Sequence, residues 1–178
     1  MKYFDELKKS MTWLGEQDNT LFIGQAVSYP GTAMFGTLED VSMSKRIELP
    51  VFEEVQMGMS LGISFGDIVP ISIFPRWNFL LCATNQLINH IDKLSFMGGD
   101  DFGSKIIIRT GIGSERPLHP QSQHIGDFTE AITKMSKTIE VIRLDEPEDI
   151  FPAYQKAYMR DDNRATICVE YGDYYAEK

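Results

Sequence analysis

The sequence predicts an α/β fold with three layers, in which helices cover both faces of a mainly parallel sheet. Short apolar runs recur along the chain and alternate with amphipathic helical segments. Such runs are typical of parallel strands, because these strands are buried on both faces. The length of 178 residues suits a single domain with a substantial core. We therefore expect one domain spanning residues 1–178.

The elements of the first half follow from apolar spacing and turn residues. Apolar residues recur at three- and four-residue spacing near the N-terminus, which predicts an amphipathic helix over residues 2–16. The elements expected next are a strand at 20–27, a turn-rich loop at 28–36, a short strand at 46–50, a helix at 52–66 and a strand at 68–74.

The second half continues the alternation, beginning with a long helix at 77–97. Its expected apolar side consists of Leu80, Leu81, Leu87, Ile88, Ile91 and Leu94. The elements expected after it are a strand at 105–110, a polar loop at 111–124, a helix at 125–136, a strand at 139–143, a helix at 147–160 and a strand at 165–170. Ligand-binding sites in such sheets usually lie at the carboxyl ends of the strands. Three places qualify: the loop after TLFIG, the turn at 49–54 and the loop after IIIRT.

Composition excludes several classes of partner. The net charge is −9 and no basic cluster occurs, so we do not expect nucleic-acid binding. No segment reaches the ~20 apolar residues that span a bilayer, and the charged N-terminus does not read as a signal peptide. Cys82 and Cys168 lie in apolar runs, which predicts buried free thiols. We expect a cytoplasmic protein.

The stretch LPVFEEVQMGMSLGISFGD, residues 49–67, contains a candidate catalytic acid. Pro50 suits a helix entrance, and Glu53 and Glu54 then lie in the first turn, where the helix dipole favours acids. Glu53 shares a helix face with Met57 and Leu61, so it points toward apolar surroundings. Such a carboxyl group is suited to exchanging a proton with a bound heterocycle.

The same helix contains three glycines spaced four residues apart, at positions 58, 62 and 66. Each costs about 1 kcal/mol relative to alanine in a helix interior. Together they form a smooth stripe that lets another backbone approach closely. The partner of this stripe is either the sheet of the same chain or a helix of another subunit.

Several segments, taken in order, resemble a known family. They are MKYFDELKKSMTWLGEQDNTLFIGQAV, MFGTLEDV, LPVFEEVQMGMSLGISFGDIVPISI, RWNFLLCATNQLINHIDKLSFMGG and IIIRTGIGSERPLHPQSQH. The chain resembles the transketolase-like pyrimidine-binding domain of thiamine diphosphate enzymes. The resemblance is closest to the β subunit of the decarboxylase component of 2-oxo acid dehydrogenases, such as pyruvate dehydrogenase, and it covers almost the whole chain.

The resemblance implies roles for individual residues. Counting from Pro50 and from Gly58 selects Glu53, not Glu54, as the family's catalytic glutamate. In the family this acid hydrogen-bonds the cofactor's aminopyrimidine and favours the imino tautomer, which takes the proton from the thiazolium carbon. Gln25 stands where the family usually has a glutamate proposed to relay protons between paired sites. A neutral amide cannot carry a proton in that way, and Gln25 remains a cofactor-binding candidate.

Aromatic residues after the next strand stack on the pyrimidine in the family. Phe79 aligns with the second of two such phenylalanines, whereas Arg76 aligns with the first. An arginine plane can stack on a ring, and Trp77 or Phe74 are alternatives.

The histidine of the following loop contacts substrate or intermediate as a proton donor in the family. Gln123-His124 matches it best, with His119 as the second candidate, and we expect His124 to be catalytic.

Part of the family's site is missing from this chain. The sequence contains no GDG motif, which in the family holds the metal that binds the diphosphate. The chain also stops near VEYGDYYAEK, where the family's pyrimidine domain ends, so we expect the C-terminal transketolase-type domain and the diphosphate-binding domain to be absent. A separate diphosphate-domain (alpha-type) subunit is then expected to hold Mg²⁺ and share the cofactor, in a two-plus-two heterotetramer. The glycine helix is expected to mediate self-association.

Three functions are compatible with these observations. The first is a catalytic subunit of a split thiamine diphosphate enzyme acting on a 2-oxo acid or a ketose-like substrate, with oxidative and non-oxidative reactions both open. The second is a non-catalytic structural or regulatory homologue, which the changes at Gln25 and Arg76 favour. The third is a stand-alone binding domain for a nucleotide-like ligand, for which GQAVSYPG makes a poor phosphate loop.

Overall fold

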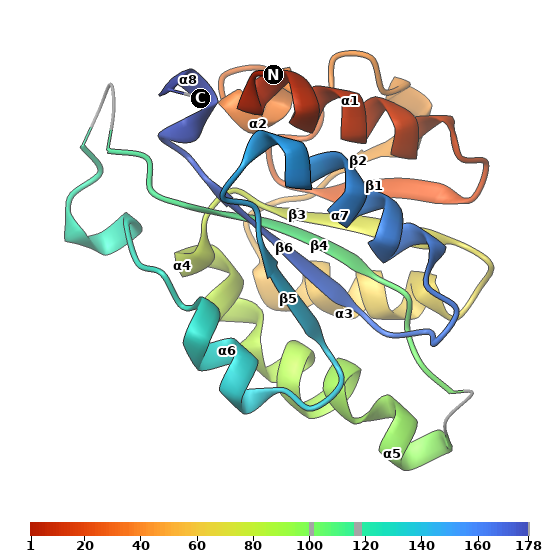
Figure 1. The fold of residues 1–178 in the computed structure, drawn as a ribbon. Helices are drawn as coiled ribbons and strands as arrows, with labels where there is room; N and C mark the ends of the chain where they lie inside the picture. Colours follow the sequence, from red (N-terminus) through yellow and green to blue (C-terminus); the bar gives the residue numbers. More distant parts are fainter. Residues whose placement is uncertain (100–101, 116–118, 178) are drawn as a thin grey trace.

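A computed structural model of the chain describes residues 1–99, 102–115 and 119–177. Its centre is a six-stranded sheet in the order β2-β1-β3-β4-β6-β5, and every neighbouring pair of strands is parallel. Helices lie on both faces of the sheet (Figure 1). The predicted three-layer α/β fold is therefore confirmed.

The strands occur where apolar runs predicted them. Their bounds are β1 (Thr20–Gly24), β2 (Arg46–Glu48), β3 (Val69–Phe74), β4 (Ile107–Ile112), β5 (Glu140–Arg143) and β6 (Thr166–Tyr171). The central strands β3 and β4 are buried along their whole length, which explains why their sequences are continuous apolar runs. Parallel pairing aligns all six carboxyl ends along one edge of the sheet.

Each face of the sheet has its own set of helices and its own apolar core. One face is covered by α1 (Tyr3–Glu16), α2 (Ala33–Gly36), α7 (Pro147–Met159) and α8 (Tyr174–Glu177). The other face is covered by α3 (Glu53–Ser64), α4 (Trp77–Leu80), α5 (Leu94–Gly98) and α6 (Thr129–Met135).

The long helix predicted at 77–97 is present but irregular. Between α4 and α5 the chain continues through short 3₁₀ turns and a π-helical turn at Gln86–His90. The prediction for Leu81 is wrong: it is 36% exposed, because it lies one position away from the buried stripe of Leu80, Leu87 and Ile91, which keeps ordinary helical spacing. The strand predicted at 20–27 ends at Gly24, and the short helices α2 and α8 were not predicted.

The two cysteines differ in environment. Cys168 is buried in β6, and burial raises the pKa of its thiol. Cys82 is exposed, so the prediction that it is buried is wrong, because it lies beside Leu81 on the outer side of the irregular helix. Within the described ranges, no helix combines the length and apolar character needed to cross a membrane.

A buried ion pair joins β4 to β6 beneath the carboxyl edge. Arg109 and Glu170 are both fully buried, and the Nη2 of Arg109 donates to Oε2 of Glu170 at 3.0 Å. Tyr154 and Tyr175 also donate to this carboxylate, and Thr37 accepts from Arg109. Burial lowers the pKa of Arg109, but the charge of Glu170 outweighs it and raises the pKa well above its usual value. The network therefore joins β4 to β6 through a buried, hydrogen-bonded ion pair.

Candidate functional site

The residues predicted to bind or act on a ligand follow different strands along the carboxyl edge. Gln25 follows β1 directly, Glu53 begins α3 after β2, and Arg76 and Phe79 follow β3. His124 lies in the segment after β4. This arrangement agrees with the general location of sites in parallel sheets.

Glu53 lies in a polar contact at this edge. Its side chain is 8% exposed, and its Oε1 accepts a hydrogen bond from Nε2 of Gln25 at 3.2 Å. The neighbouring Glu54 points elsewhere, because its Oε1 accepts from Nδ2 of Asn85 at 2.7 Å and Nε2 of Gln86 at 3.1 Å. The two adjacent acids therefore occupy different environments, and only Glu53 contacts another predicted site residue.

Glu48 is a residue of this corner that sequence reasoning missed. Its carboxylate accepts hydrogen bonds from the backbone N–H groups of Ala26, Val27 and Ser28 at 2.7–2.8 Å. Ala26 has a φ of 56°, which is rare for a residue with a side chain. Glu48 thus fixes the backbone that follows Gln25. An acid at the end of a strand beside a turn-rich loop was the available signal.

Arg76 does not stack on an aromatic ring of the described residues. Its Nη1 donates to the carbonyl oxygens of Gly113 and His124, the latter at 2.9 Å. Burial lowers the pKa of Arg76, and the charge of Asp173 opposes this shift. The alternatives Trp77 and Phe74 are both fully buried in the protein core, so the suggestion that either stacks on a bound ring is wrong.

Phe79 and His124 lie together, with ring centroids 5.3 Å apart and a tilt of 48°. The Nδ1 of His124 is buried and has no hydrogen-bond partner in the described part of the chain. His119 is instead half exposed, and its Nδ1 accepts from the backbone N–H of Gln121 at 3.0 Å. Of the two predicted histidines, only His124 therefore joins the cluster of Arg76 and Phe79.

The glycine stripe of α3 does not pack on the sheet. A Cβ at Gly58 would meet only the side chain of Gln86, at 3.7 Å, and a Cβ at Gly62 would have nothing within 4 Å. A Cβ at Gly66 would meet only the carbonyl of Ile63 in the preceding turn. The alternative in which the stripe packs on the sheet of the same chain is therefore wrong.

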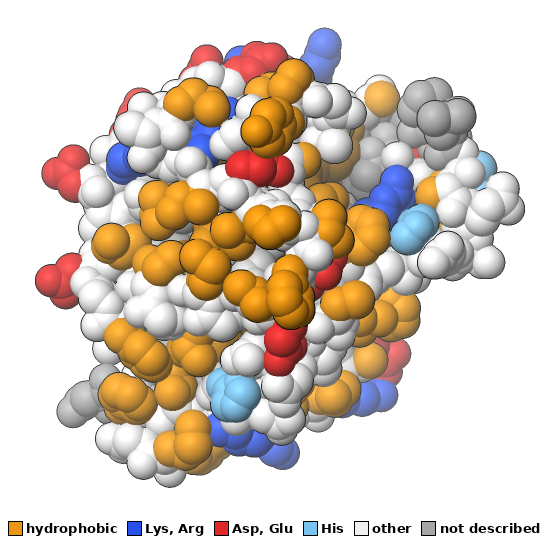
Figure 2. All heavy atoms as spheres, turned by 180° about the vertical axis from the view of Figure 1, so that it is seen from behind, with side chains coloured by type: hydrophobic (Ala, Val, Ile, Leu, Met, Phe, Trp, Pro, Cys, Tyr) orange, Lys and Arg blue, Asp and Glu red, His pale blue; other side chains and the backbone are white. Residues whose placement is uncertain are grey.

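The polarity of α3 is inverted relative to an ordinary surface helix. Its buried residues include the polar Glu53, Gln56 and Ser60. Apolar residues at and near the helix are instead exposed; we call Phe52, Val55, Met59 and Phe65, which are 39–58% exposed, the α3 outer face. Figure 2, drawn from behind the view of Figure 1, shows hydrophobic side chains gathered across the middle of the molecule.

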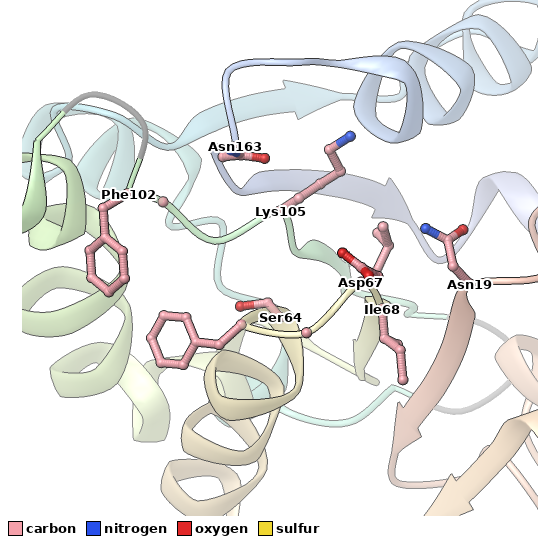
Figure 3. Close-up of a pocket in the computed structure, with 11 residues that line it drawn as sticks. Asn19, Ser64, Asp67, Ile68, Phe102, Lys105 and Asn163 are labelled. Carbon is pink, nitrogen blue, oxygen red and sulfur yellow. The ribbon is translucent and has the colours of Figure 1, made fainter.

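One sizeable cavity lies away from these residues. It has a volume of about 500 Å³ and lies among loops at the amino ends of strands, where Asp67, Lys105 and Asn163 line it (Figure 3). No predicted site residue lines it. A smaller cavity of about 150 Å³ lies at the carboxyl edge and is lined by Arg76, Gly113 and Tyr175 among others. Within the described ranges, no group of three or more His, Cys, Asp or Glu side chains could hold a metal ion.

Comparison with known proteins identifies relatives of this chain. The 2-oxoisovalerate dehydrogenase subunit beta of Bacillus subtilis (strain 168) is 24% identical over 92% of this chain and 50% of its own length. The pyruvate dehydrogenase E1 component subunit beta of Gracilaria tenuistipitata var. liui is 28% identical over 72% of this chain and 42% of its own. The chain is therefore similar in sequence to these β subunits over most of its length. It spans half or less of the length of these two curated relatives.

The chain also has a structural neighbour with the same fold. A split gene transketolase, described as an inactive beta4 tetramer, superposes with a TM-score of 0.69 over 93% of this chain and 50% of its own, at 12% identity. No family model matches the chain. The resemblance to 2-oxo acid dehydrogenase β subunits and the transketolase-like fold are thus both confirmed.

Proposed function

We propose that this chain is the pyrimidine-binding subunit of a split, heteromeric thiamine diphosphate enzyme. It acts on a 2-oxo acid or a ketose-like substrate by decarboxylation or by cleavage or formation of a carbon–carbon bond, and it works in the cytoplasm. The observation that carries the proposal is the position of Glu53. A largely buried carboxylate lies at the carboxyl edge of a parallel sheet and is hydrogen-bonded to a neutral amide rather than to a cation.

The described residues fit the pyrimidine half of the cofactor. Glu53 has one neutral partner, Gln25, so its carboxylate retains acceptor capacity for a protonated ring nitrogen. The buried Nδ1 of His124 has no described partner, and groups of this kind are normally satisfied in a complete site. Phe79 contributes an aromatic ring beside it.

Each residue has a defined role in the proposal. Glu53 holds and moves a proton at the ring nitrogen of the pyrimidine, and Gln25 orients Glu53. His124 donates a proton to the substrate, and Phe79 positions the pyrimidine. Thiamine diphosphate supplies the carbanion chemistry when it is bound, and the protein sets its orientation.

The diphosphate half of the site belongs to a partner in this proposal. The sequence has no GDG motif, so a diphosphate-domain subunit of the alpha type holds the diphosphate and Mg²⁺. The curated relatives are themselves named as β subunits, which supports a two-subunit enzyme. In this proposal, residues 1–178 form one pyrimidine-binding domain.

The α3 outer face supports self-association of this subunit. Its exposed apolar residues flank the open glycines at 58 and 62. Burying a stripe of this kind against a second copy would remove apolar surface from water and let the helices approach closely. The structural neighbour is described as an inactive beta4 tetramer, which supports association between copies of this subunit. We therefore assign the α3 outer face to a β–β contact within a heterotetramer.

A non-catalytic homologue is the second candidate function. Gln25 cannot relay a proton, and Arg76 replaces an aromatic residue of the family, and both changes favour a structural or regulatory role. The presence of Glu53, hydrogen-bonded to Gln25, and of the Phe79–His124 cluster argues against a non-catalytic role.

The test is co-expression with an alpha-type subunit encoded near this chain, followed by measurement of thiamine diphosphate binding in the presence of magnesium. In the complex, Glu53→Gln should slow exchange of the thiazolium proton by about 10²- to 10⁴-fold, because a positioned acid–base group contributes about that much. Glu54→Gln is the matched control. It changes the adjacent acid, which hydrogen-bonds Asn85 and Gln86, and should leave exchange near the wild-type rate.

Two results would count against the proposal. If the complexes assemble but never bind the cofactor, the catalytic function is excluded and the structural or regulatory function remains. Equal exchange rates in the two glutamate variants would show that Glu53 has another role.

A further inference from the structure

Arg76 is a cation whose hydrogen-bonding capacity is only half used. Its Nη1 donates to the carbonyls of Gly113 and His124, which fix the guanidinium against two parts of the segment after β4. Among the described residues, Nε and Nη2 of Arg76 have no hydrogen-bond partner. A guanidinium offers five N–H groups in a planar fork, so the side that remains can bind an oxyanion through two parallel bonds.

Other arginines of the chain are occupied differently. Arg109 pairs with Glu170, and Arg143 pairs with Asp127 and Asp145. Arg46 has no acid partner, but its Nε, Nη1 and Nη2 all donate to backbone carbonyls. Arg76 therefore stands apart as an anchored guanidinium with an unoccupied edge and no described carboxylate accepting a hydrogen bond from it.

The surroundings of Arg76 form a site for a small group. Arg76 lines the cavity of about 150 Å³ at the carboxyl edge, a volume suited to one carboxylate or phosphate group with a few carbons. The cavity is bounded by backbone of Gly111, Gly113 and Gly172, positions without side chains to fill it. Because His124 accepts from Arg76 through its carbonyl, this cavity adjoins the Phe79–His124 cluster.

We propose that Arg76 binds an anionic group of the substrate through its Nε–Nη2 edge. The assignment of that anion to a substrate rests on the proposed function, whereas the anion site itself does not. Arg76 is then a specificity-determining residue, and its place in the alignment of aromatic residues reflects a change in what the site recognises rather than a loss of function.

The charge balance of the reaction identifies which anionic group this is. A carboxylate that leaves as carbon dioxide loses its negative charge as the bond breaks. An arginine paired with that carboxylate would stabilise the ground state more than the transition state and slow the reaction. The group on Arg76 is therefore one that keeps its charge throughout. The substrate class is a 2-oxo acid with a second acidic group, or a phosphorylated ketose.

The site can be tested on the whole chain alone, without partner or cofactor. The ¹⁵N–¹H resonance of the Arg76 Nε–H group is followed by NMR while propionate or inorganic phosphate is added. We expect a saturable shift of this resonance with the preferred anion. Preference for propionate would indicate the dicarboxylic substrate, and preference for phosphate would indicate the phosphorylated one.

Two variants of Arg76 separate the effect of its positive charge from that of its planar, bidentate geometry. Arg76→Gln should weaken binding at least about tenfold, because it removes a charge-assisted bidentate contact. Arg76→Lys keeps the charge but not the fork, and should give an intermediate affinity. Arg164→Gln is the matched control, since Arg164 is 44% exposed and lies in the loop before β6, at the amino edge, where its change should leave affinity unaltered. Backbone amide spectra of each variant establish that the fold is retained.

The proposal fails if neither anion shifts the Arg76 resonance, or if Arg76→Gln binds as well as wild type. This outcome is distinct from failure of the proposed function. A chain that binds an anion on Arg76 but never assembles with a cofactor would keep the anion site and lose only its assignment to a substrate.

Discussion

The helices α1 and α3 pack on opposite faces of one sheet and have opposite polarity. In α1 the buried side contains Leu7, Met11 and Leu14. In α3 the buried side is mostly polar, with Gln56 and Ser60 beside the one fully buried apolar residue, Met57, and other apolar residues are exposed. The comparison teaches that α1 completes its packing within this chain. In contrast, α3 exposes an apolar surface of the kind that is covered by another protein.

Specific hydrogen bonds hold the buried polar side chains of α3, although Oε1 of Gln56 has no partner among the described residues. The Nε2 of Gln56 donates to the carbonyl of Ile73 at 2.9 Å and to Ser72 Oγ at 3.2 Å. Ser60 Oγ donates to Ser72 Oγ at 3.0 Å. A Cβ at Gly24 would lie 2.9 Å from Gln56 Nε2 and 2.3 Å from the carbonyl of Ile73. Glycine at position 24 therefore lets this amide reach the sheet.

The largest effect is expected from truncating the buried side of α1. Leu14→Ala should lower the free energy of unfolding by about 2–5 kcal/mol, because it removes apolar contacts and leaves a cavity. Val55→Ala on α3 should change it by less than about 0.5 kcal/mol in the free chain, since Val55 is 42% exposed. Urea denaturation measures both values. Similar losses in the two variants would break the comparison.

The next largest effect concerns association through the α3 outer face. Met59→Glu should weaken self-association at least about 30-fold, because an unpaired carboxylate in an apolar contact costs about 2 kcal/mol or more. Met159→Glu makes the same substitution at a methionine that is 70% exposed at the end of α7 and should have no effect. Analytical ultracentrifugation gives the dissociation constants. A wild-type chain that stays monomeric at high concentration would remove the assignment of this face.

A smaller effect is expected from removing the buried amide of α3. Gln56→Leu should lower the free energy of unfolding by about 1–2 kcal/mol, because the hydrogen bond to Ile73 is lost and Ser72 loses a donor. Thermal unfolding of the two proteins measures the difference. An increase in stability would mean that the inverted polarity of α3 has no structural basis in this amide.

The smallest effect distinguishes the glycines of the two helices. Gly62→Ala in α3 should raise the free energy of unfolding of the isolated chain by about 0.5–1 kcal/mol, because a Cβ there meets nothing within 4 Å. Gly15→Ala in α1 should gain less, since its Cβ would lie 3.3 Å from Val41. In the associated state Gly62→Ala should instead be the less stable of the two variants, because the added methyl group separates the α3 helices of the two copies. Stability measured below and above the association concentration tests both statements.

The fold was predictable because its strands are buried on both faces. Continuous apolar runs then identify strands such as Val69–Phe74 without tertiary information. Short helices such as Tyr174–Glu177 carry too little periodicity to be recognised from spacing. Cys82 and Leu81 were misplaced because they stand in a continuous apolar run between Leu80 and Ala83, which are the buried residues, and apolar character alone does not tell which members of such a run face the core.

The candidate site was predictable only in part. The family resemblance selected Glu53 over Glu54, and the two acids do occupy different environments, although the catalytic role itself stays a prediction. The orientation of Arg76 toward two carbonyls could not be read from sequence, because the carbonyl of His124 comes from a segment 48 positions away. Glu48 was missed although it is an acid at a strand end beside a turn-rich loop, because that signal does not tell which backbone amides the acid will meet.

The hydrogen bonds of Glu48 have a consequence for how an assembled site would form. Fixing the backbone of one residue costs about 1–2 kcal/mol of conformational entropy. One carboxylate on the edge strand already restrains Ala26, Val27 and Ser28 while the chain is alone. A ligand or subunit that binds beside Gln25 therefore meets a backbone that is already ordered. Less of its binding free energy is spent on ordering these residues, and more remains as affinity.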